Sequence, residues 1–309
     1  MRKQGGYSAS AIMNRCLILN NKTLYGLLSG LGAAAIWGGM YVVSKVVLEI
    51  IPPFTLVALR LILGILTLAI VLAWRGGLRV TRQQFLQIFG VGFVGYGISL
   101  SLQFLGTKLS TAANGSLVTS ATPAFVLLFA WILLSEKITL CKSIALVLAT
   151  LGVIAVIDPR AAQLNPELFL GNIFLLGAAV TWALYSVLVR KTTQNLDVLT
   201  FSMIAFIGGL PVAIPAGVWE LKTVGVGAIS LGVVGGVLFL GIISTALAMV
   251  LWNNAFAILD AGSASLTFFA QPIVGTLLGW FFLGEKITPL FLVGGVLIGI
   301  GILISAREN

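Results

Sequence analysis

The segment that decides the fold covers residues 123–139 and reads PAFVLLFAWILLSEKIT. It returns 149 residues later, at residues 272–288, as PIVGTLLGWFFLGEKIT. The proline, the tryptophan and the closing Glu-Lys-Ile-Thr stay in register. A second match pairs Gly-Ala-Ala and Trp37 with Gly-Ala-Ala and Trp182, 145 residues apart. Apolar bias explains shared Ala and Gly, but not shared Trp and Glu-Lys-Ile-Thr, so the chain consists of two related halves.

Composition places both halves in a membrane. Of 309 residues, 59% are hydrophobic and 9% are charged, whereas soluble domains carry roughly 25% charged residues. A membrane-spanning helix needs about 20 apolar residues. Ten runs of this kind are expected, at residues 24–44, 54–73, 85–107, 113–134, 140–157, 168–189, 197–218, 224–251, 262–283 and 288–305. The sequence therefore predicts an all-α polytopic membrane protein.

Basic residues indicate the orientation of these helices, because Lys and Arg collect in cytoplasmic loops. With the N-terminus inside, twelve of the 18 Lys and Arg lie on the cytoplasmic side, five lie outside and Arg60 lies within a helix. The +9 charge is thus dispersed between helices, and no basic face for nucleic acid can be assembled. We expect a multi-pass protein of a bacterial inner membrane with both termini in the cytoplasm.

Five helices per half is an odd number, so the second half must enter the bilayer inverted relative to the first. The expected parts are a cytoplasmic tail (1–23), the first repeat (24–157), an external linker (158–167), the second repeat (168–305) and a cytoplasmic end (306–309). Inverted repeats are common in secondary transporters, whose substrate site lies near the bilayer midplane between the repeats.

The pattern of Trp37, then Pro52-Pro53 and Arg60, then the two Pro…Glu-Lys segments resembles the EamA-type branch of the drug/metabolite transporter superfamily. The resemblance covers nearly the whole chain from about residue 24. It implies a ten-helix bundle in the bacterial inner membrane that moves amino acids or related metabolites, usually outward. It does not identify the substrate.

Several kinds of chemistry are absent from the sequence. There is no histidine, and the two cysteines, Cys16 and Cys141, are far apart. We therefore expect no metal site, no cofactor and no catalytic residue. None of the nine acidic residues lies clearly inside an expected helix, so no proton carrier is evident.

Arg60 is the one basic residue inside an expected helix. An intramembrane cation is by default a functional hypothesis, and a guanidinium could bind a substrate carboxylate with two parallel hydrogen bonds. The alternative is that Arg60 reaches the outer surface or pairs with Glu49.

Polar and aromatic residues form stripes at helical spacing on several expected helices. They should face the bundle interior or a wet cavity, since polar groups are costly against lipid. The candidate substrate-binding residues are Trp37, Tyr41, Arg60, Tyr96, Gln103, Asn114, Thr122, Trp182, Tyr185, Thr267 and Gln271. Each single residue could instead only hydrogen-bond a neighbouring helix.

Each of the other motifs has a structural interpretation as well as a functional one. Pro123 and Pro272 could kink their helices as joints or be passive kinks. Glu136 and Glu285 could cap the following helix, or form a gating contact between the halves. Gly295 and Gly299 form a GxxxG pair, which suits close packing within the bundle or a dimer interface.

The expected function is export of amino acids or related small metabolites by alternating access. A flippase for lipid-linked or lipid-like substrates is the alternative on the same fold. An intramembrane enzyme is disfavoured because the usual catalytic constellations cannot be assembled. A structural or signalling protein that transports nothing is also disfavoured, because buried stripes of polar residues would cost stability without serving such a role.

Overall fold

The computed structural model describes residues 21–76, 80–110, 118–157, 168–193, 196–283 and 289–306. All regular structure in these ranges is helical and forms ten helical segments, which confirms the predicted class. The first half comprises α2 (Asn21–Ile50), α3 (Pro53–Trp74), α4 (Arg82–Gly92) with η1 (Phe93–Ser99) and α5 (Leu100–Leu109), α7 (Thr122–Leu134) and α8 (Leu140–Ile157). The second comprises α9 (Phe169–Thr192), α10 (Val198–Thr223), α11 (Leu231–Leu238) with η4 (Phe239–Leu247) and α12 (Ala248–Ile258), α13 (Ala261–Leu266) with η5 (Thr267–Phe269) and α14 (Ala270–Leu283), and α15 (Pro289–Ala306).

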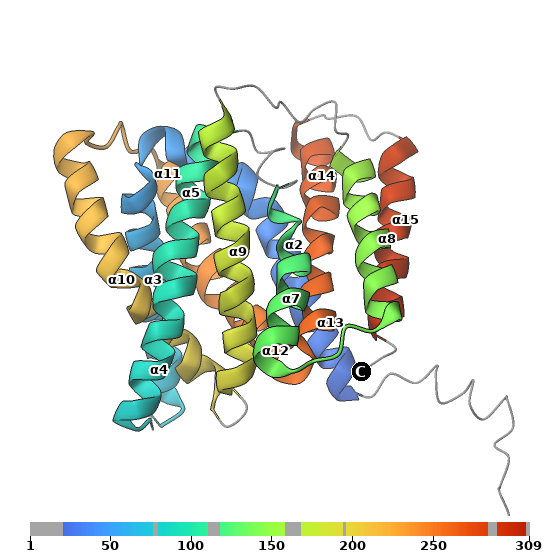
Figure 1. Ribbon diagram of the computed structural model, residues 1–309. Coiled ribbons are helices and arrows are strands. Elements are labelled where there is room, and N and C mark those ends of the chain that lie inside the picture. The colour runs from blue at the N-terminus through green and yellow to red at the C-terminus, as the bar shows by residue number, and fades with distance from the viewer. Residues whose placement is uncertain are drawn as a thin grey trace, which may run out of the picture.

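These segments form a bundle of roughly aligned helices (Figure 1). Among the described residues, six helices are long and apolar enough to cross a membrane. Large apolar side chains such as Leu140, Phe169 and Leu292 are exposed on its outside. An exposed apolar surface around a polar-containing interior is what a lipid environment requires.

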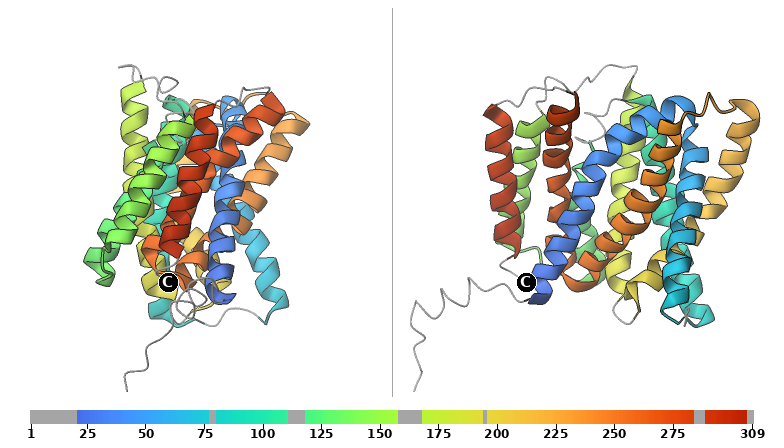
Figure 2. Two further views of the ribbon diagram at one scale, coloured as in Figure 1. Left: turned by 90° about the vertical axis from the view of Figure 1, so that its right-hand side faces the viewer. Right: turned by 180° about the vertical axis from the view of Figure 1, so that it is seen from behind.

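The main contacts between helices are symmetric: each main contact between a helix of the first half and one of the second has a counterpart with the two halves interchanged. The second helix of each half pairs with the other, α3 against α10, and the fifth does the same, α8 against α15. The first helix α2 packs on α12 and α14, and its counterpart α9 packs on α5 and α7. Figures 1 and 2 show α8 and α15 side by side at one edge of the bundle from opposite directions. The sequence repeat is therefore matched by a repeat in packing.

The third helix of each half changes from α to π geometry near its middle, at η1 and at η4. Glycines accompany both changes. A Cβ on Gly95 would overlap the Tyr185 ring, and one on Gly241 would lie 2.6 Å from Leu63. Absence of these side chains lets the neighbouring helices approach closely where the turns widen.

Helix limits were predicted least well around residue 224. The seventh helix was expected to end at residue 218 but continues to Thr223, and the eighth was expected at 224–251 but spans Leu231–Ile258. The reason is local: Gly225 has φ +76° and its N–H donates to the Glu220 carbonyl. A left-handed glycine just past the last turn ends a helix, although hydropathy continues through it.

Two motif expectations were also wrong. Pro123 lies in the first turn of α7, where no backbone N–H is required, so it does not kink a helix interior. A Cβ on Gly295 or Gly299 would meet no described atom within 4 Å, whereas one on Gly301 would meet Ala145. The favoured packing of the GxxxG pair within the bundle is therefore not found in the part of the chain that the structure describes.

Candidate substrate cavity

A cavity lies between the two halves. The first half contributes Trp37 and Met40 from α2, together with residues of η1, α5 and the start of α7; the second contributes residues of α9, α12, η5 and α14. The described lining is Trp37, Met40, Ser99, Leu100, Gln103, Thr119, Thr122, Ala178, Ala179, Trp182, Met249, Phe268 and Gln271.

Several lining residues are counterparts of one another in the repeat. Trp37 and Trp182 are 145 residues apart. Three further pairs share the offset of 149, namely Leu100 with Met249, Thr119 with Phe268, and Thr122 with Gln271. A cavity formed by equivalent positions of two repeats lies on their shared axis, where transporters of this architecture bind substrate.

The cavity is narrow in this structure. Its volume is about 30 Å³. Sites for small molecules span roughly 300–1,000 Å³. Side chains or helices must therefore move before a metabolite can enter.

Aromatic rings form one wall. Trp37 meets Trp182 edge to face, with ring centroids 5.8 Å apart, and lies 6.1 Å from Phe268. Trp252 packs behind Trp37 at 5.3 Å. The indole N–H of Trp37 donates to the Ser244 carbonyl at 3.1 Å, which fixes the ring. Trp37 and Trp182 are buried, so neither is an interfacial anchor. The wall offers rigid, flat apolar surface.

Uncharged polar groups gather around Tyr41. Its hydroxyl accepts a hydrogen bond from Nε2 of Gln103 at 3.1 Å and shares another with Thr119 Oγ1 at 3.2 Å. Gln271 Nε2 donates to the Trp37 carbonyl at 3.4 Å. Amide and hydroxyl groups of this kind can rearrange to bind a polar substrate without any charge of their own.

Arg60 lies behind Met40, outside the described lining. Its guanidinium is fully buried and donates from Nε to Thr245 Oγ1 at 3.0 Å and to the Leu240 carbonyl at 3.3 Å. The alternative that Arg60 reaches the surface or pairs with Glu49 is wrong, because these partners hold it in the interior. They lie in η4, about 180 residues away in the sequence, so the first half alone gave no sign of them.

Not every predicted site residue reaches the cavity. Trp37, Gln103, Thr122, Trp182 and Gln271 line it. The structure places Tyr41 and Arg60 directly behind lining residues. Asn114 lies outside the described residues.

Three others have partners elsewhere in the core. The Tyr96 and Tyr185 hydroxyls hydrogen-bond each other, and Tyr185 also donates to Asn253 Oδ1 at 2.8 Å. Asn253 in turn donates to Ser202 Oγ. Thr267 donates to the Ala264 carbonyl within its own helix. For these positions the geometry matches the alternative of bonding between or within helices.

The repeat offset of 149 residues would have predicted two further residues near the cavity that the polar and aromatic stripes did not include. Adding 149 to Gln103 gives Trp252, and adding it to Thr119 gives Phe268. Phe268 belongs to the aromatic wall, and Trp252 supports the wall from behind. Met40 and Met249 carry no such polar or aromatic signal and could not be singled out from one sequence.

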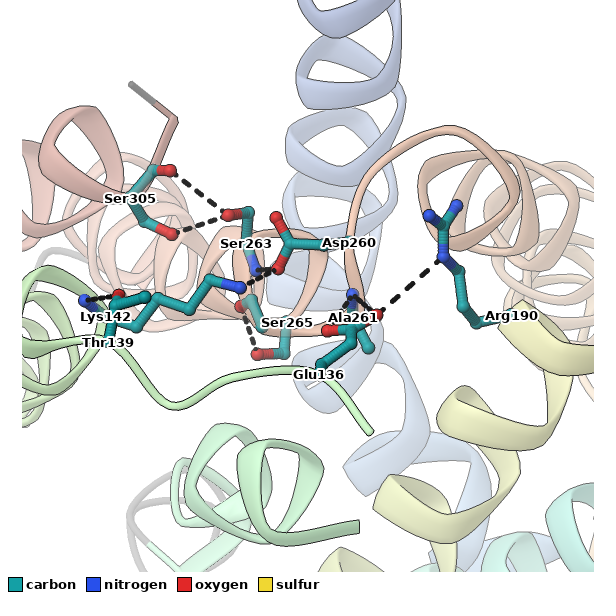
Figure 3. A network of polar contacts seen from close by, with 10 residues as sticks. Glu136, Thr139, Lys142, Arg190, Asp260, Ala261, Ser263, Ser265 and Ser305 are labelled. Atoms are coloured by element: carbon teal, nitrogen blue, oxygen red, sulfur yellow. Dashed lines mark hydrogen bonds and ion pairs between the residues drawn. The ribbon is translucent and has the colours of Figure 1, made fainter. Parts of the chain in front are cut away.

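A polar network crosses between the halves at one end of the bundle (Figure 3). The Glu136 carboxylate, in the turn after α7, accepts from the Ala261 N–H at 3.1 and 3.2 Å and lies 3.9 Å from Arg190 Nε of α9. Beside it, Lys142 Nζ of α8 lies 2.7 Å from Asp260 Oδ1. The expectation that Glu136 caps the next helix is wrong: Thr139 caps α8, and Glu136 reaches the first residue of α13 in the other half.

The sequence did not predict one buried carboxylate, that of Glu220. Glu220 is 6% exposed and accepts from the backbone N–H and hydroxyl of Thr55 at 2.9 and 3.2 Å. It thus satisfies the start of α3, where Pro52 offers no side-chain cap. Among the described residues, no group of three or more acidic, Cys or His side chains could hold a metal ion.

Comparison with known proteins decides the family. A family model described as "EamA-like transporter family" matches residues 24–157 and again residues 169–307. The chain belongs to the EamA-like transporter family. Its two matches are the two halves, and it is accordingly a multi-pass membrane protein that transports rather than catalyses.

Several transporters are similar to this chain over nearly their whole length. "Uncharacterized transporter YoaV" of Bacillus subtilis (strain 168) is 23% identical, with 92% of this chain and 96% of that protein aligned. An "Uncharacterized transporter" of Archaeoglobus fulgidus is 25% identical over 88% of this chain and 95% of its own. One solved crystal structure superposes with a TM-score of 0.74 at 21% identity, covering 90% of this chain and 95% of that one. That likeness concerns the fold alone.

Proposed function

We propose that this EamA-like transporter exports amino acids or related small metabolites across a bacterial inner membrane by alternating access. The observation that carries the proposal is the cavity lined from repeat-equivalent positions of both halves. A site on the axis between two similar units can be exposed to either side as one unit rocks against the other. The units would be residues 24–157 and 168–305, with both chain ends in the cytoplasm.

An inverted arrangement of the halves is supported by helix direction. In Figures 1 and 2, α2 begins at the lower end of the bundle, whereas its counterpart α9 begins at the upper end. Lys45 and Arg190 are equivalent, 145 residues apart, and each donates to carbonyls where a helix ends. Lys45 does so at Ser110, and Arg190 at Phe256 and Ala257.

The Glu136 network supports alternation because its own contacts between the halves are a hydrogen bond to a backbone N–H and ion pairs. Its basic members Lys142 and Arg190 are two of the twelve Lys and Arg residues expected on the cytoplasmic side. A partly exposed ion pair and a charged hydrogen bond can form and break at modest cost. In this proposal the network holds the cytoplasmic end closed and releases it when the halves rock.

Counterflow in proteoliposomes tests the proposal. Vesicles preloaded with each member of a panel of amino acids and small metabolites should accumulate the same labelled compound when it is a substrate. A variant with the cavity filled, Ala179→Trp, should lose this uptake. The matched control Gly235→Trp adds the same side chain where a Cβ meets no described atom within 4 Å. Uptake of no compound, together with transbilayer movement of labelled lipid, would instead support the flippase alternative.

A further inference from the structure

Arg60 is a buried cation with part of its hydrogen-bonding capacity unused. Its side chain is 0% exposed, and Nη1 has no hydrogen-bond partner. The remaining edge is held firmly: Nε by Thr245 and the Leu240 carbonyl, and Nη2 by Ser244 Oγ at 3.3 Å. The guanidinium carbon also lies 4.7 Å from the centre of the Phe104 ring. The group is thus fixed in orientation with one nitrogen available.

No carboxylate of the described residues pairs with this cation. Asp260 pairs with Lys142, and Glu136 lies near Arg190, so neither carboxylate serves Arg60. Taking a charge out of water is energetically costly unless a counter-charge and hydrogen bonds compensate. The partners of Arg60 are neutral, so the charge itself is not compensated by this part of the protein. An anion from outside the chain would provide that compensation.

One flexible side chain, Met40, contacts both the guanidinium and the cavity. Met40 lines the cavity, and its Sδ lies 3.7 Å from Nη2 of Arg60. Leu100 also lines the cavity, one turn before Phe104 on the same helix. Methionine has three rotatable bonds and adapts its shape easily. Rotation of Met40 would open the narrow cavity toward Arg60 and add the space that it lacks.

The cavity itself carries no charge. Its described lining consists of aromatic, aliphatic, Met, Ser, Thr and Gln residues, with neither acid nor base among them. The ammonium of a substrate would therefore find no carboxylate in that lining. The aromatic wall formed by Trp37, Trp182 and Phe268 favours a flat or bulky apolar body.

We propose that Arg60 binds the carboxylate of the substrate, and that the substrate is an acid with an aromatic or bulky apolar body. This inference rests on the proposed function and names its substrate class. The carboxylate accepts from Nη1 of Arg60, which has no hydrogen-bond partner, once Met40 beside Nη2 has moved and the cavity has widened, and the apolar body lies against the aromatic wall. A free amino group on the substrate is not required, so amino acids and acids that lack the amine share the decisive group.

Binding of four matched compounds to the purified full-length protein tests the proposal. Indole-3-propionate carries the carboxylate alone, tryptophan carries both charges, tryptamine carries the amine alone, and indole-3-propanamide is neutral. We expect the two carboxylates to bind at least about tenfold more tightly than the amide, and tryptamine to bind no better than the amide. In Arg60→Gln this preference should disappear while binding of the amide stays unchanged, and Arg60→Lys should keep part of it.

Lys45→Gln removes an exposed cation and serves as the control, with binding expected to match that of the unmodified protein. Equal binding of acid and amide by the unmodified protein would overturn the inference. Equal loss of all four compounds in Arg60→Gln would overturn it too, since it would make Arg60 a structural residue. Transport of a neutral or cationic compound would support the proposed carrier function but would contradict the proposal that the substrate needs a carboxylate. Carboxylate binding without any counterflow would contradict the carrier instead.

Discussion

Glu136→Gln is the perturbation that addresses closure of one end of the bundle. The carboxylate accepts two hydrogen-bond contacts from the Ala261 N–H at 3.1 and 3.2 Å and lies 3.9 Å from Arg190. Glutamine keeps an acceptor but loses the charge. The difference between a charged and a neutral hydrogen bond is about 1 kcal/mol. The partly exposed pair with Arg190 adds up to ~1 kcal/mol. Closure should therefore weaken by about 1–2 kcal/mol, roughly a 5- to 30-fold shift in population.

Labelling of a cysteine in the cavity measures this shift. Ala179→Cys places a thiol in the lining after Cys16 and Cys141 are replaced by serine. A membrane-impermeant thiol reagent, added from the Glu136 side in oriented vesicles, should react about 5–30 times faster in Glu136→Gln, as worked from the lost interactions.

Lys137→Gln is the matched control, because it neutralises an exposed neighbour in the same turn. It should leave the labelling rate unchanged. If Glu136→Gln also leaves the rate unchanged, or if Lys137→Gln accelerates it equally, the network does not hold that end closed.

Two further predictions concern packing. Gly208→Ala should lower stability by about 1–3 kcal/mol, because its Cβ would overlap the Phe89 carbonyl of α4; Gly235→Ala, with no described atom within 4 Å, should not. Thermal unfolding in detergent distinguishes them, and equal melting temperatures would contradict the close contact between α4 and α10. Asn253→Ala removes the link between Tyr185 and Ser202 and should cost about 0.5–1.5 kcal/mol by the same assay. A loss of transport without a loss of stability would show that Asn253 does more than join helices.

Features that depend on repetition and hydropathy could be predicted from the sequence. Ten helices and two halves follow from the apolar runs and from the matched Pro, Trp and Glu-Lys positions. The helix end near Gly225 could not, because it depends on one φ angle of +76° inside a run that remains apolar. Local conformation there overrides the hydropathy of the surrounding residues.

Partners of charged groups were the least predictable part of the site. Arg60 was given a surface alternative because nothing near it in the sequence could compensate its charge. Its partners Ser244 and Thr245 come from the other half. Glu136 likewise caps a helix start 125 residues away rather than the one that follows it. Such pairings exist only once the halves are packed, so they require the fold.

Glu220 is another case in which the sequence did not predict the surroundings of a charged side chain. Its helix was expected to end at residue 218, which would have left the carboxylate in a loop. The helix continues, and the side chain is buried against Thr55. A prediction of acidic residues within helices depends on helix ends, which hydropathy places only to within a few residues.

The inversion of two halves that share one cavity is tested most directly by the sidedness of two equivalent turns. Lys137→Cys and Lys286→Cys, each in the cysteine-free chain, place a thiol at the same position of the two repeats. We expect an impermeant reagent to label them from opposite faces of the membrane. Labelling of both from the same face would make the halves parallel and contradict the inverted arrangement.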